Sequence, residues 1–380
     1  MTAVLRSDAR AVTVAVSTMT AYALPYFLTA SLALDIGRDL DITVARLGLA
    51  ITGFWVAATF ASAPAGWLVD RVGAVSSTRI AGAVVVVGAL GIAAVARSFV
   101  AFAVFLALTA LGNALVTPSM SALVTGDLRA RRRGAVLGLQ QAGPPLASVL
   151  AGLALPTVSV ALGWRWVTVL GAVAAAIATA TVHGPRPSVA QGCRLSAQGP
   201  EPRAFLLLLA AGGVVATSAA TGLAAYLVVY AARSGLSTSA AGVLLAVASI
   251  VCAATRIWLG ISSDRRRSPL LLQIAVLVLA GAIGFALLTI GSPAAAIVGS
   301  VLAVGIGWGW SGLYLLAAVE HGGATPGRAV GTAVTGTFAG AMLGPLLVGL
   351  LATAASFEAA WAVCAALSVV GGATFLAAGR

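Results

Sequence analysis

Apolar runs of about 20 residues recur along the whole chain, and only short polar loops separate them. Each run is long enough to cross a hydrocarbon layer of about 30 Å as a helix, whose backbone hydrogen bonds are satisfied internally. Only 8% of the 380 residues are charged and the mean hydropathy is +1.06, whereas a soluble domain carries roughly a quarter of charged residues. The chain is therefore predicted to be an all-α membrane protein.

About 12 transmembrane helices are expected, with ends uncertain by a few residues. They are predicted at 12–34, 45–68, 79–96, 99–123, 134–158, 164–183, 204–231, 239–261, 269–290, 294–318, 329–354 and 357–378. One longer polar stretch is rich in Pro, Gly, Ser and Gln, which indicates a linker between two six-helix bundles. We expect an N-terminal half at 1–183, a cytoplasmic linker at 184–203 and a C-terminal half at 204–380.

The net charge of +12 comes entirely from arginines in the short loops. With a cytoplasmic N-terminus, 17 of the 22 arginines fall on the cytoplasmic side and 5 on the other. Positive loops face the cytoplasm, so an even number of spans and two cytoplasmic termini are predicted. The charge thus indicates a topology and not a nucleic-acid partner, and the expected location is the bacterial inner membrane.

The residues give no sign of a cofactor, a metal site or an enzyme. The three cysteines, Cys193, Cys252 and Cys364, are scattered, which argues against a disulfide framework. No Ser/His/Asp set or paired carboxylate remains once the topology is assigned. We predict neither a cofactor nor an enzymatic activity.

A repeat relates the two halves. Asp70 follows the second predicted span and Asp264 follows the eighth, at an offset of 264 − 70 = 194 residues. The fifth and eleventh spans begin with Ala135-Val136 and Ala329-Val330, again 194 residues apart. Parallel repeats of six helices are typical of one large transporter architecture.

The loop after the second span contains Gly66-Trp67-Leu68-Val69-Asp70-Arg71-Val72-Gly73. This pattern, Gly-x-Leu-x-Asp-Arg-x-Gly, resembles the loop signature of the major facilitator superfamily. A weaker copy with Gly260, Asp264 and Arg265 follows the eighth span. The resemblance covers nearly the whole chain and implies two pseudo-symmetric six-helix bundles. The family's further basic residues are replaced here by Ala74 and Val75.

The resemblance also implies a role for the two loop acids in gating. Asp70 would face the start of the eleventh span near Gly327 to Gly331, and Asp264 the start of the fifth near Arg133 and Gly134. Helix N-termini attract anions because their amides are unpaired and the macrodipole is positive there. Gly66 would allow the helices to approach closely. The alternative is that both acids are solvated loop residues.

A second family pattern, associated with antiporters, combines a glycine row with a Gly-Pro pair that permits a kink. The fifth span keeps Gly143-Pro144 but has Ala147 and Ser148 in place of the closing glycines. The eleventh span, with Gly344-Pro345, matches better, although the pattern belongs on the fifth. Ordinary helix packing explains these glycines equally well.

Polar and aromatic residues near the middle of the spans are the candidates for lining a solute cavity between the halves. They are Tyr22, Tyr26, Asn113, Thr117, Gln140, Gln141, Thr221, Tyr226, Trp310 and Tyr314. Interhelical hydrogen bonding is the alternative role for each. An aromatic and amide set of this kind favours a neutral or amphipathic organic solute.

No acidic residue is predicted at the centre of a span, where proton-coupled transporters usually place one. Asp35 and Glu320, near span ends, are the possible coupling residues, with solvent exposure as the alternative. Arg256 either binds an anionic solute or extends to the cytoplasmic rim and steadies Asp264. We expect the second.

The sequence thus predicts a monomeric secondary or facilitative transporter of a small organic solute, working by alternating access, with efflux of amphipathic compounds as one direction. Uptake of a small metabolite or anion is a second reading. A membrane sensor that keeps the transporter fold is a third.

Overall fold

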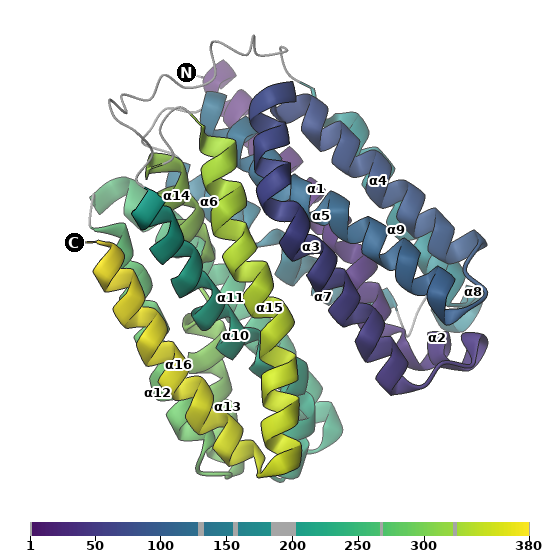
Figure 1. Cartoon of the computed structure of the whole chain (residues 1–380), viewed down its shortest axis with the longest axis vertical. Coiled ribbons are helices and arrows are strands. Elements are labelled where there is room, and N and C mark those ends of the chain that lie inside the picture. The colour runs from purple at the N-terminus through teal and green to yellow at the C-terminus, as the bar shows by residue number, and fades with distance from the viewer. Residues whose placement is uncertain are drawn as a thin grey trace. The chain divides into compact units, whose positions relative to one another are not determined.

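The computed structural model describes residues 2–127, 133–154, 159–183, 203–266, 269–321 and 325–379 (Figure 1). Every regular element within these ranges is a helix. The predicted all-α class is therefore confirmed. The predicted linker at 184–203 lies outside the described residues except for Arg203, which begins a helix.

Eleven described helical segments are long and apolar enough to cross a membrane. They are Val12–Ser31, Arg46–Val72, Ala74–Ala94, Phe99–Val124, Trp164–Thr181, Arg203–Arg233, Ala240–Arg265, Leu270–Leu288, Pro293–His321, Pro326–Ala354 and Phe357–Ala378. The predicted fifth span, 134–158, is not among them. A turn at Gln141 and Ala142 divides it into α6 (Arg133–Gln140) and α7 (Gly143–Ala154). The expectation of one continuous helix there was wrong, and its last residues, 155–158, lie outside the described ranges.

The chain forms two compact units, and each includes a short segment from the other half of the sequence. Unit 1 comprises Met1–Arg129, Gly143–Gly199 and Gly322–Gly331; unit 2 comprises Ala130–Ala142, Pro200–His321 and Thr332–Arg380. The short segments contain the starts of the predicted fifth and eleventh spans. The first half of the chain therefore contributes α6 to unit 2, and the second half contributes the first turn of a helix to unit 1.

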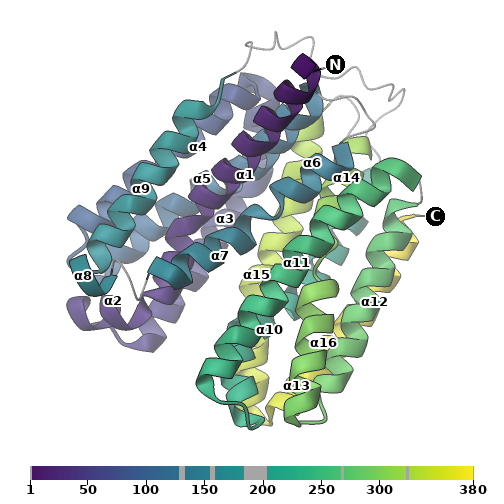
Figure 2. The same ribbon diagram turned by 180° about the vertical axis from the view of Figure 1, so that it is seen from behind.

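Unit 1 contains α7 and seven further helices: α1 (Thr2–Ser31), α2 (Ala33–Leu40), α3 (Val44–Val72), α4 (Ala74–Ala94), α5 (Phe99–Asp127), α8 (Val160–Leu162) and α9 (Trp164–Thr181). The helix α4 packs along both α5 and α9 (Figures 1 and 2). Gly88 and Gly91 of α4 lie against Thr109 and Phe105 of α5, and small residues of this kind let membrane helices approach closely. Gly73, at φ 85°, ends α3 and directly precedes α4.

Unit 2 contains α6 with α10 (Arg203–Arg233), α11 (Thr238–Arg266), α12 (Leu270–Leu288), α13 (Pro293–Ser300), the π-helix η3 (Val301–Ile306), α14 (Ser311–His321), α15 (Pro326–Ala354) from Thr332 onward, and α16 (Phe357–Ala378). The helix α16 packs on α10 and α12, and α11 packs on α6 (Figure 2). Ser292 caps α13 by accepting from the Ala295 amide at 3.2 Å, and Pro293 opens that helix.

The tenth span is interrupted near its middle. The helix α13 continues into η3, and a turn at residues 307–310 separates η3 from α14. Gly305, Gly307 and Gly309 occupy alternate positions across this break. Glycine lowers helix stability, so this row favours a break at that place. Unit 2 thus contains two interrupted segments, one after α6 and one before α14.

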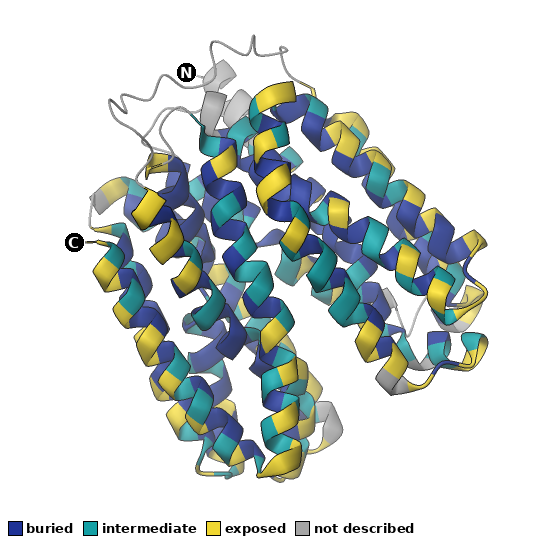
Figure 3. Cartoon of the chain, viewed as in Figure 1, coloured by how far each residue is buried: buried dark blue, intermediate teal, exposed yellow. Residues whose placement is uncertain are grey.

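Large apolar side chains lie exposed on the outer faces of the helices (Figure 3). Phe60 on α3 and Leu350 on α15 are 78% and 71% exposed. Many other large apolar side chains of these helices are exposed as well, and extended exposed apolar surfaces mark contact with a membrane or another protein. The arrangement matches helices whose outer faces contact lipid.

Candidate functional site

Asp70, in the last turn of α3, caps the N-terminus of α15. Its Oδ1 accepts a hydrogen bond from the Gly327 amide at 3.0 Å, and its Oδ2 accepts one from the Arg328 amide at 2.8 Å. The first amides of a helix have no intrahelical acceptor, and the positive end of the macrodipole attracts a carboxylate. We call this contact the Asp70 cap. It lies within unit 1 and joins segments 257 and 258 residues apart.

Glycine at position 66 is required by the approach of the same two helices. A Cβ at Gly66 would lie within 3.0 Å of the Gly327 carbonyl carbon and of the Gly331 Cα. Since these are backbone atoms, no side-chain rearrangement can relieve the overlap. Gly66 therefore lets α3 come close enough for Asp70 to reach the amides.

Asp264, near the end of α11, caps α6 in the same way. Its Oδ1 and Oδ2 accept hydrogen bonds from the Gly134 and Ala135 amides, both at 2.8 Å. A Cβ at Gly260 would lie 2.9 Å from the Gly134 carbonyl carbon, so this pair also makes a backbone contact. This Asp264 cap lies within unit 2.

The two caps follow the repeat that the sequence predicts. Gly66 and Gly260 are separated by the same 260 − 66 = 194 residues as the two aspartates. The basic residues after the aspartates, Arg71 and Arg265, are exposed, and the Arg71 guanidinium lies 4.0 Å from the centroid of the Trp67 ring. The guanidinium of Arg71 therefore stacks on its own helix.

In unit 1, the predicted solute residues differ in their surroundings. The Tyr22 hydroxyl is hydrogen-bonded to the Thr78 carbonyl at 3.1 Å and to Thr179 Oγ1 at 2.7 Å, so it joins α1, α4 and α9. The Tyr26 ring stacks on Phe54 at 5.2 Å between centroids. On α5, Thr117 is buried and Asn113 is half-buried. The contacts of Tyr22 match the structural alternative.

In unit 2, the predicted aromatic residues mostly belong to the core. Trp310 and Tyr314 are each 1% exposed, and their ring centroids lie 5.1 Å apart. The Tyr314 hydroxyl lies 2.8 Å from the Ala333 carbonyl and 3.2 Å from the Leu209 carbonyl, so it links α14 to α15 and α10. Thr221 donates to the Thr217 carbonyl of its own helix at 2.8 Å. Tyr226 is half-buried beside Phe357, with ring centroids 6.0 Å apart.

The predicted amides Gln140 and Gln141 lie at the end of α6. Gln140 is fully buried, whereas Gln141 is half-buried in the turn that follows α6. The Gln141 carbonyl accepts a hydrogen bond of 2.6 Å from Arg256 Nη1. The break in the fifth span thus places Gln141 beside a charged group of α11.

Arg256 does not extend to the rim and does not contact Asp264, contrary to the expectation from the sequence. Its side chain is 4% exposed, and Nη2 donates to the Trp308 carbonyl at 3.3 Å. Asp264 is eight residues further along α11, about 12 Å in a helix. Because both interrupted segments of unit 2 offer carbonyls to it, the guanidinium stays inside the helix bundle.

The two possible coupling residues lie near helix ends. Asp35 on α2 accepts a 2.9 Å hydrogen bond from the Ser159 hydroxyl. Glu320 is exposed in the last turn of α14. Neither lies at the middle of a span, in agreement with the positions expected from the sequence.

The Gly-Pro pairs have different structural roles in the two halves. Gly143 and Pro144 are the first two residues of α7, directly after the turn, where proline is favoured because its missing amide hydrogen is not needed. Gly344 and Pro345 lie inside α15, which continues through them. The break in the fifth span is therefore just before its Gly-Pro pair.

A polar network at the end of unit 1 away from the Asp70 cap was not predicted from the sequence. Arg165, at the start of α9, donates to the Ala93 and Ala96 carbonyls at 2.9 and 3.0 Å and pairs with Asp39 at 2.9 Å. Trp164 Nε1 also donates to Asp39, at 3.2 Å. The Trp-Arg pair after Gly163 was visible, but nothing local in the sequence names Asp39 as its partner.

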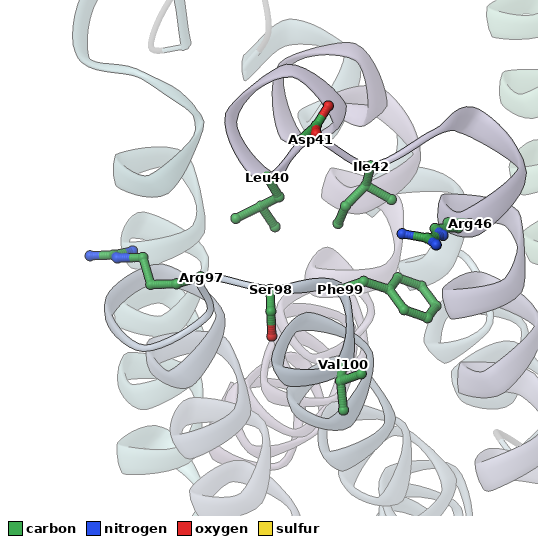
Figure 4. Close-up of a pocket in the computed structure, with 8 residues that line it drawn as sticks. All are labelled: Leu40, Asp41, Ile42, Arg46, Arg97, Ser98, Phe99 and Val100. Atoms are coloured by element: carbon green, nitrogen blue, oxygen red, sulfur yellow. The ribbon is translucent and has the colours of Figure 1, made fainter.

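The same end of unit 1 contains a pocket of about 500 Å³ (Figure 4). Its walls are the loop between α2 and α3 and the loop between α4 and α5, with lining residues Leu40, Asp41, Ile42, Arg46, Arg97, Ser98, Phe99 and Val100. None of the predicted solute residues lines it. Among the described residues, no cluster of His, Cys, Asp and Glu could hold a metal ion.

Comparisons with known proteins agree with this fold. A family model described as Major Facilitator Superfamily matches residues 12–325. No curated protein sequence matches the chain. The fold is similar to that of the proton:xylose symporter XylE bound to 6-bromo-6-deoxy-D-glucose, at a TM-score of 0.77 and 12% identity over 96% of this chain and 94% of that one.

Two further structures are similar. The E. coli fucose:proton symporter FucP gives a TM-score of 0.76 at 14% identity, over 97% of this chain and 98% of that one. The human organic anion transporter MFSD10 gives 0.74 at 16% identity, over 97% and 99%. At these identities the similarity shows the fold alone.

Proposed function

The chain belongs to the major facilitator superfamily and is a secondary transporter, and from this premise we propose that it moves a small organic solute across the bacterial plasma membrane by alternating access. The two halves at 1–183 and 204–380 form the moving bundles, with the linker at 184–203 in the cytoplasm. The protein acts as a monomer.

The pair of aspartate caps is the observation that carries this proposal. Each cap joins an aspartate in the last turn of a helix from one sequence half to the first turn of a helix from the other half. When the two halves separate at the end of the transporter where the caps lie, both caps must break. A carboxylate at a helix N-terminus contributes about 0.3–1 kcal/mol, and up to about 2 kcal/mol when partly buried. Two caps therefore favour the closed form of that end without locking it.

The Arg distribution supports a cytoplasmic position for the caps. Arg71 and Arg265 directly follow the two aspartates, and Arg328 lies in the first turn of α15, which Asp70 caps. Loops of this composition stay on the cytoplasmic side. The caps would then hold the transporter closed to the cytoplasm, and their opening would release the solute inward or admit it for export.

The direction of transport follows the gradient that drives it. Efflux of amphipathic compounds fits the apolar helices and the Gly-Pro pairs. Uptake or facilitated diffusion is the second candidate, favoured by one observation: Asp35 and Glu320 lie near helix ends, and the described residues place no acid at the middle of a span. XylE and FucP are described as proton symporters, and a similar coupling here would depend on those two acids.

Uptake into proteoliposomes tests the proposal. The purified chain is reconstituted, and a panel of radiolabelled sugars, amino acids, organic anions and amphipathic cations is offered with and without a proton gradient. We expect saturable flux of at least one solute class. Absence of flux for every class, from protein that remains folded, would contradict transport and favour the sensor reading.

A further inference from the structure

Arg256 is a buried cation close to the middle of a membrane span. The span on α11 runs from Ala240 to Arg265, so Arg256 lies about 5 Å from its midpoint. The side chain is 4% exposed. A charge at this depth is unfavourable unless it is paired or serves a substrate pathway.

No carboxylate pairs with Arg256 among the described residues. Its contacts are the Gln141 and Trp308 carbonyls, the Trp308 ring at 5.2 Å from the guanidinium carbon, and Cys252 one turn earlier on α11. The buried Nε has no hydrogen-bond partner within the described ranges. Carbonyl dipoles and an aromatic face lower the cost of the charge but do not neutralise it. A positive charge and one donor thus remain available.

The two interrupted segments next to Arg256 also contain buried polar side chains. Gln141 Oε1 and Ser311 Oγ are buried in the same unit and have no partner in the described parts of the chain. Gln141 follows α6 and Ser311 begins α14, so both lie at the interrupted segments that Arg256 joins. Membrane transporters place substrate sites at broken helices near the bilayer midplane.

The repeat shows that the fold does not need an arginine at this place. The equivalent position is 256 − 194 = 62, where Ser62 donates to the Ala58 carbonyl of its own helix at 2.7 Å. The helix that corresponds to the tenth span, α5, runs without a break from Phe99 to Asp127. Within the described residues, Arg256 and both breaks belong to unit 2. A role in packing common to both halves does not explain them.

We propose that Arg256 binds the oxyanion group, a carboxylate or a phosphate, of an organic anion, with the Trp308 ring against the apolar part of that anion. Guanidinium is the side chain best suited to planar or branched oxyanions, because its donors are fixed in one plane. The inference rests on the proposed transport function and names its substrate class. It replaces the neutral solute that the aromatic and amide residues alone favour.

Thermal unfolding of the purified full-length chain in detergent tests the proposal directly. The probes are benzoate, succinate and phenyl phosphate, with benzamide, succinamide and benzyl alcohol as neutral counterparts, all at constant ionic strength. We expect at least one anion to raise the Tm by several degrees in a saturable manner, as mass action requires for a ligand of the folded state. The neutral counterparts should leave the Tm within one degree, on the order of the measurement error.

Two variants connect the effect to Arg256. Arg256→Gln should abolish the anion-dependent rise. Cys252→Asp places a carboxylate one helical turn from Arg256, at a spacing that allows it to pair with the guanidinium. This variant should also lose the anion response, while its Tm without ligand stays equal to the native value or rises. The proposal can therefore be tested even if Arg256→Gln does not fold.

Three results would overturn the proposal: no rise with any of the three anions, equal rises with the neutral counterparts, or a response that persists in Cys252→Asp. Proteoliposome flux separates this inference from the proposed function. If the protein transports neutral solutes only, and Arg256→Gln transports them at the same rate, the proposed anion site is refuted and the proposed transport function is supported. If an anion raises the Tm but no solute is transported, the transport function is contradicted and the proposed anion site at Arg256 is supported.

Discussion

The carboxylate of Asp70 accepts a 2.8 Å hydrogen bond from the backbone amide of Arg328, 258 residues further along the chain. The acid belongs to the first sequence half and the amide to the second. The Asp264 cap has the same relationship in the opposite sense. Each half therefore stabilises the start of a helix of the other.

Asp70→Asn should lower transport and leave solute binding largely unchanged. The amide side chain keeps one acceptor but loses the charge that the helix N-terminus attracts, a change of about 1–2 kcal/mol or roughly ten-fold in the population of the capped form. Initial uptake rates in proteoliposomes measure the first effect, and equilibrium binding of the same solute measures the second.

Asp41→Asn is the control for this variant, since Asp41 is an exposed acid that ends α2 through its backbone amide, and its carboxylate makes no hydrogen bond within the described residues. Its uptake rate should equal that of the native chain. Loss of binding in Asp70→Asn, with the fold intact, would contradict the gating role.

Gly260→Ala should weaken the Asp264 cap and lower stability. The new Cβ would overlap the Gly134 backbone, and overpacking of this kind costs about 1–3 kcal/mol. Gly242→Ala, on the same helix with no atom within 4 Å of the added Cβ, is the matched control. Alanine should stabilise the helix there or leave it unchanged. Equal Tm values for both variants would show that the close approach at Gly260 is unimportant.

Tyr314→Phe should lower the Tm, because the buried hydroxyl bonds to two carbonyls of neighbouring helices, and a buried hydrogen bond contributes about 1 kcal/mol. Solute affinity should change less than about two-fold, equivalent to about 0.4 kcal/mol. Tyr226→Phe, whose hydroxyl makes no hydrogen bond within the described residues, should keep the native Tm. A large loss of solute affinity in Tyr314→Phe would support the cavity role predicted from the sequence.

Arg165→Gln should reduce stability more than Asp39→Asn. The Arg165–Asp39 pair is 25% and 48% exposed, and such pairs contribute at most about 1 kcal/mol. Arg165 also donates to the carbonyls of Ala93 and Ala96 at the end of α4. Removal of the arginine leaves these carbonyls without that donor, whereas removal of the acid does not. Thermal unfolding of both variants decides the order, and equal losses would assign the stability to the ion pair.

Helices that end at ordinary boundaries were predictable from apolar runs and turn residues. The predicted span 357–378 coincides with α16, and 269–290 differs from α12 (Leu270–Leu288) by one or two residues at each end. The cap partners of Asp70 were implied by the family resemblance and not by the residues alone. The predicted domain boundaries stay a prediction.

The breaks and the place of Arg256 were not predictable in the same way. Leu139, Gln140 and Gln141 contain no strong helix breaker, but Pro144 lacks the amide hydrogen that would bond to the Gln140 carbonyl, so the Gly143-Pro144 pair was a local sign of the first break. The turn also accepts a hydrogen bond from α11, 115 residues further along, which no local pattern shows. A local pattern cannot show that Arg256, Gln141 and Trp308 meet. The glycine row at residues 305–309 was the one local sign of the second break.

Distances between spin labels on the two sequence halves test the gating account most directly. With the native cysteines replaced by serine, labels are placed at two exposed positions: Val72→Cys, two residues after Asp70, and Pro269→Cys, five residues after Asp264. The proposed gating requires the distance between these labels to change when the caps open. Pulsed electron paramagnetic resonance on the Asp70→Asn, Asp264→Asn double variant should show a larger population of long distances than the labelled native chain. Identical distance distributions for the two proteins would contradict the claim that the caps hold this end closed.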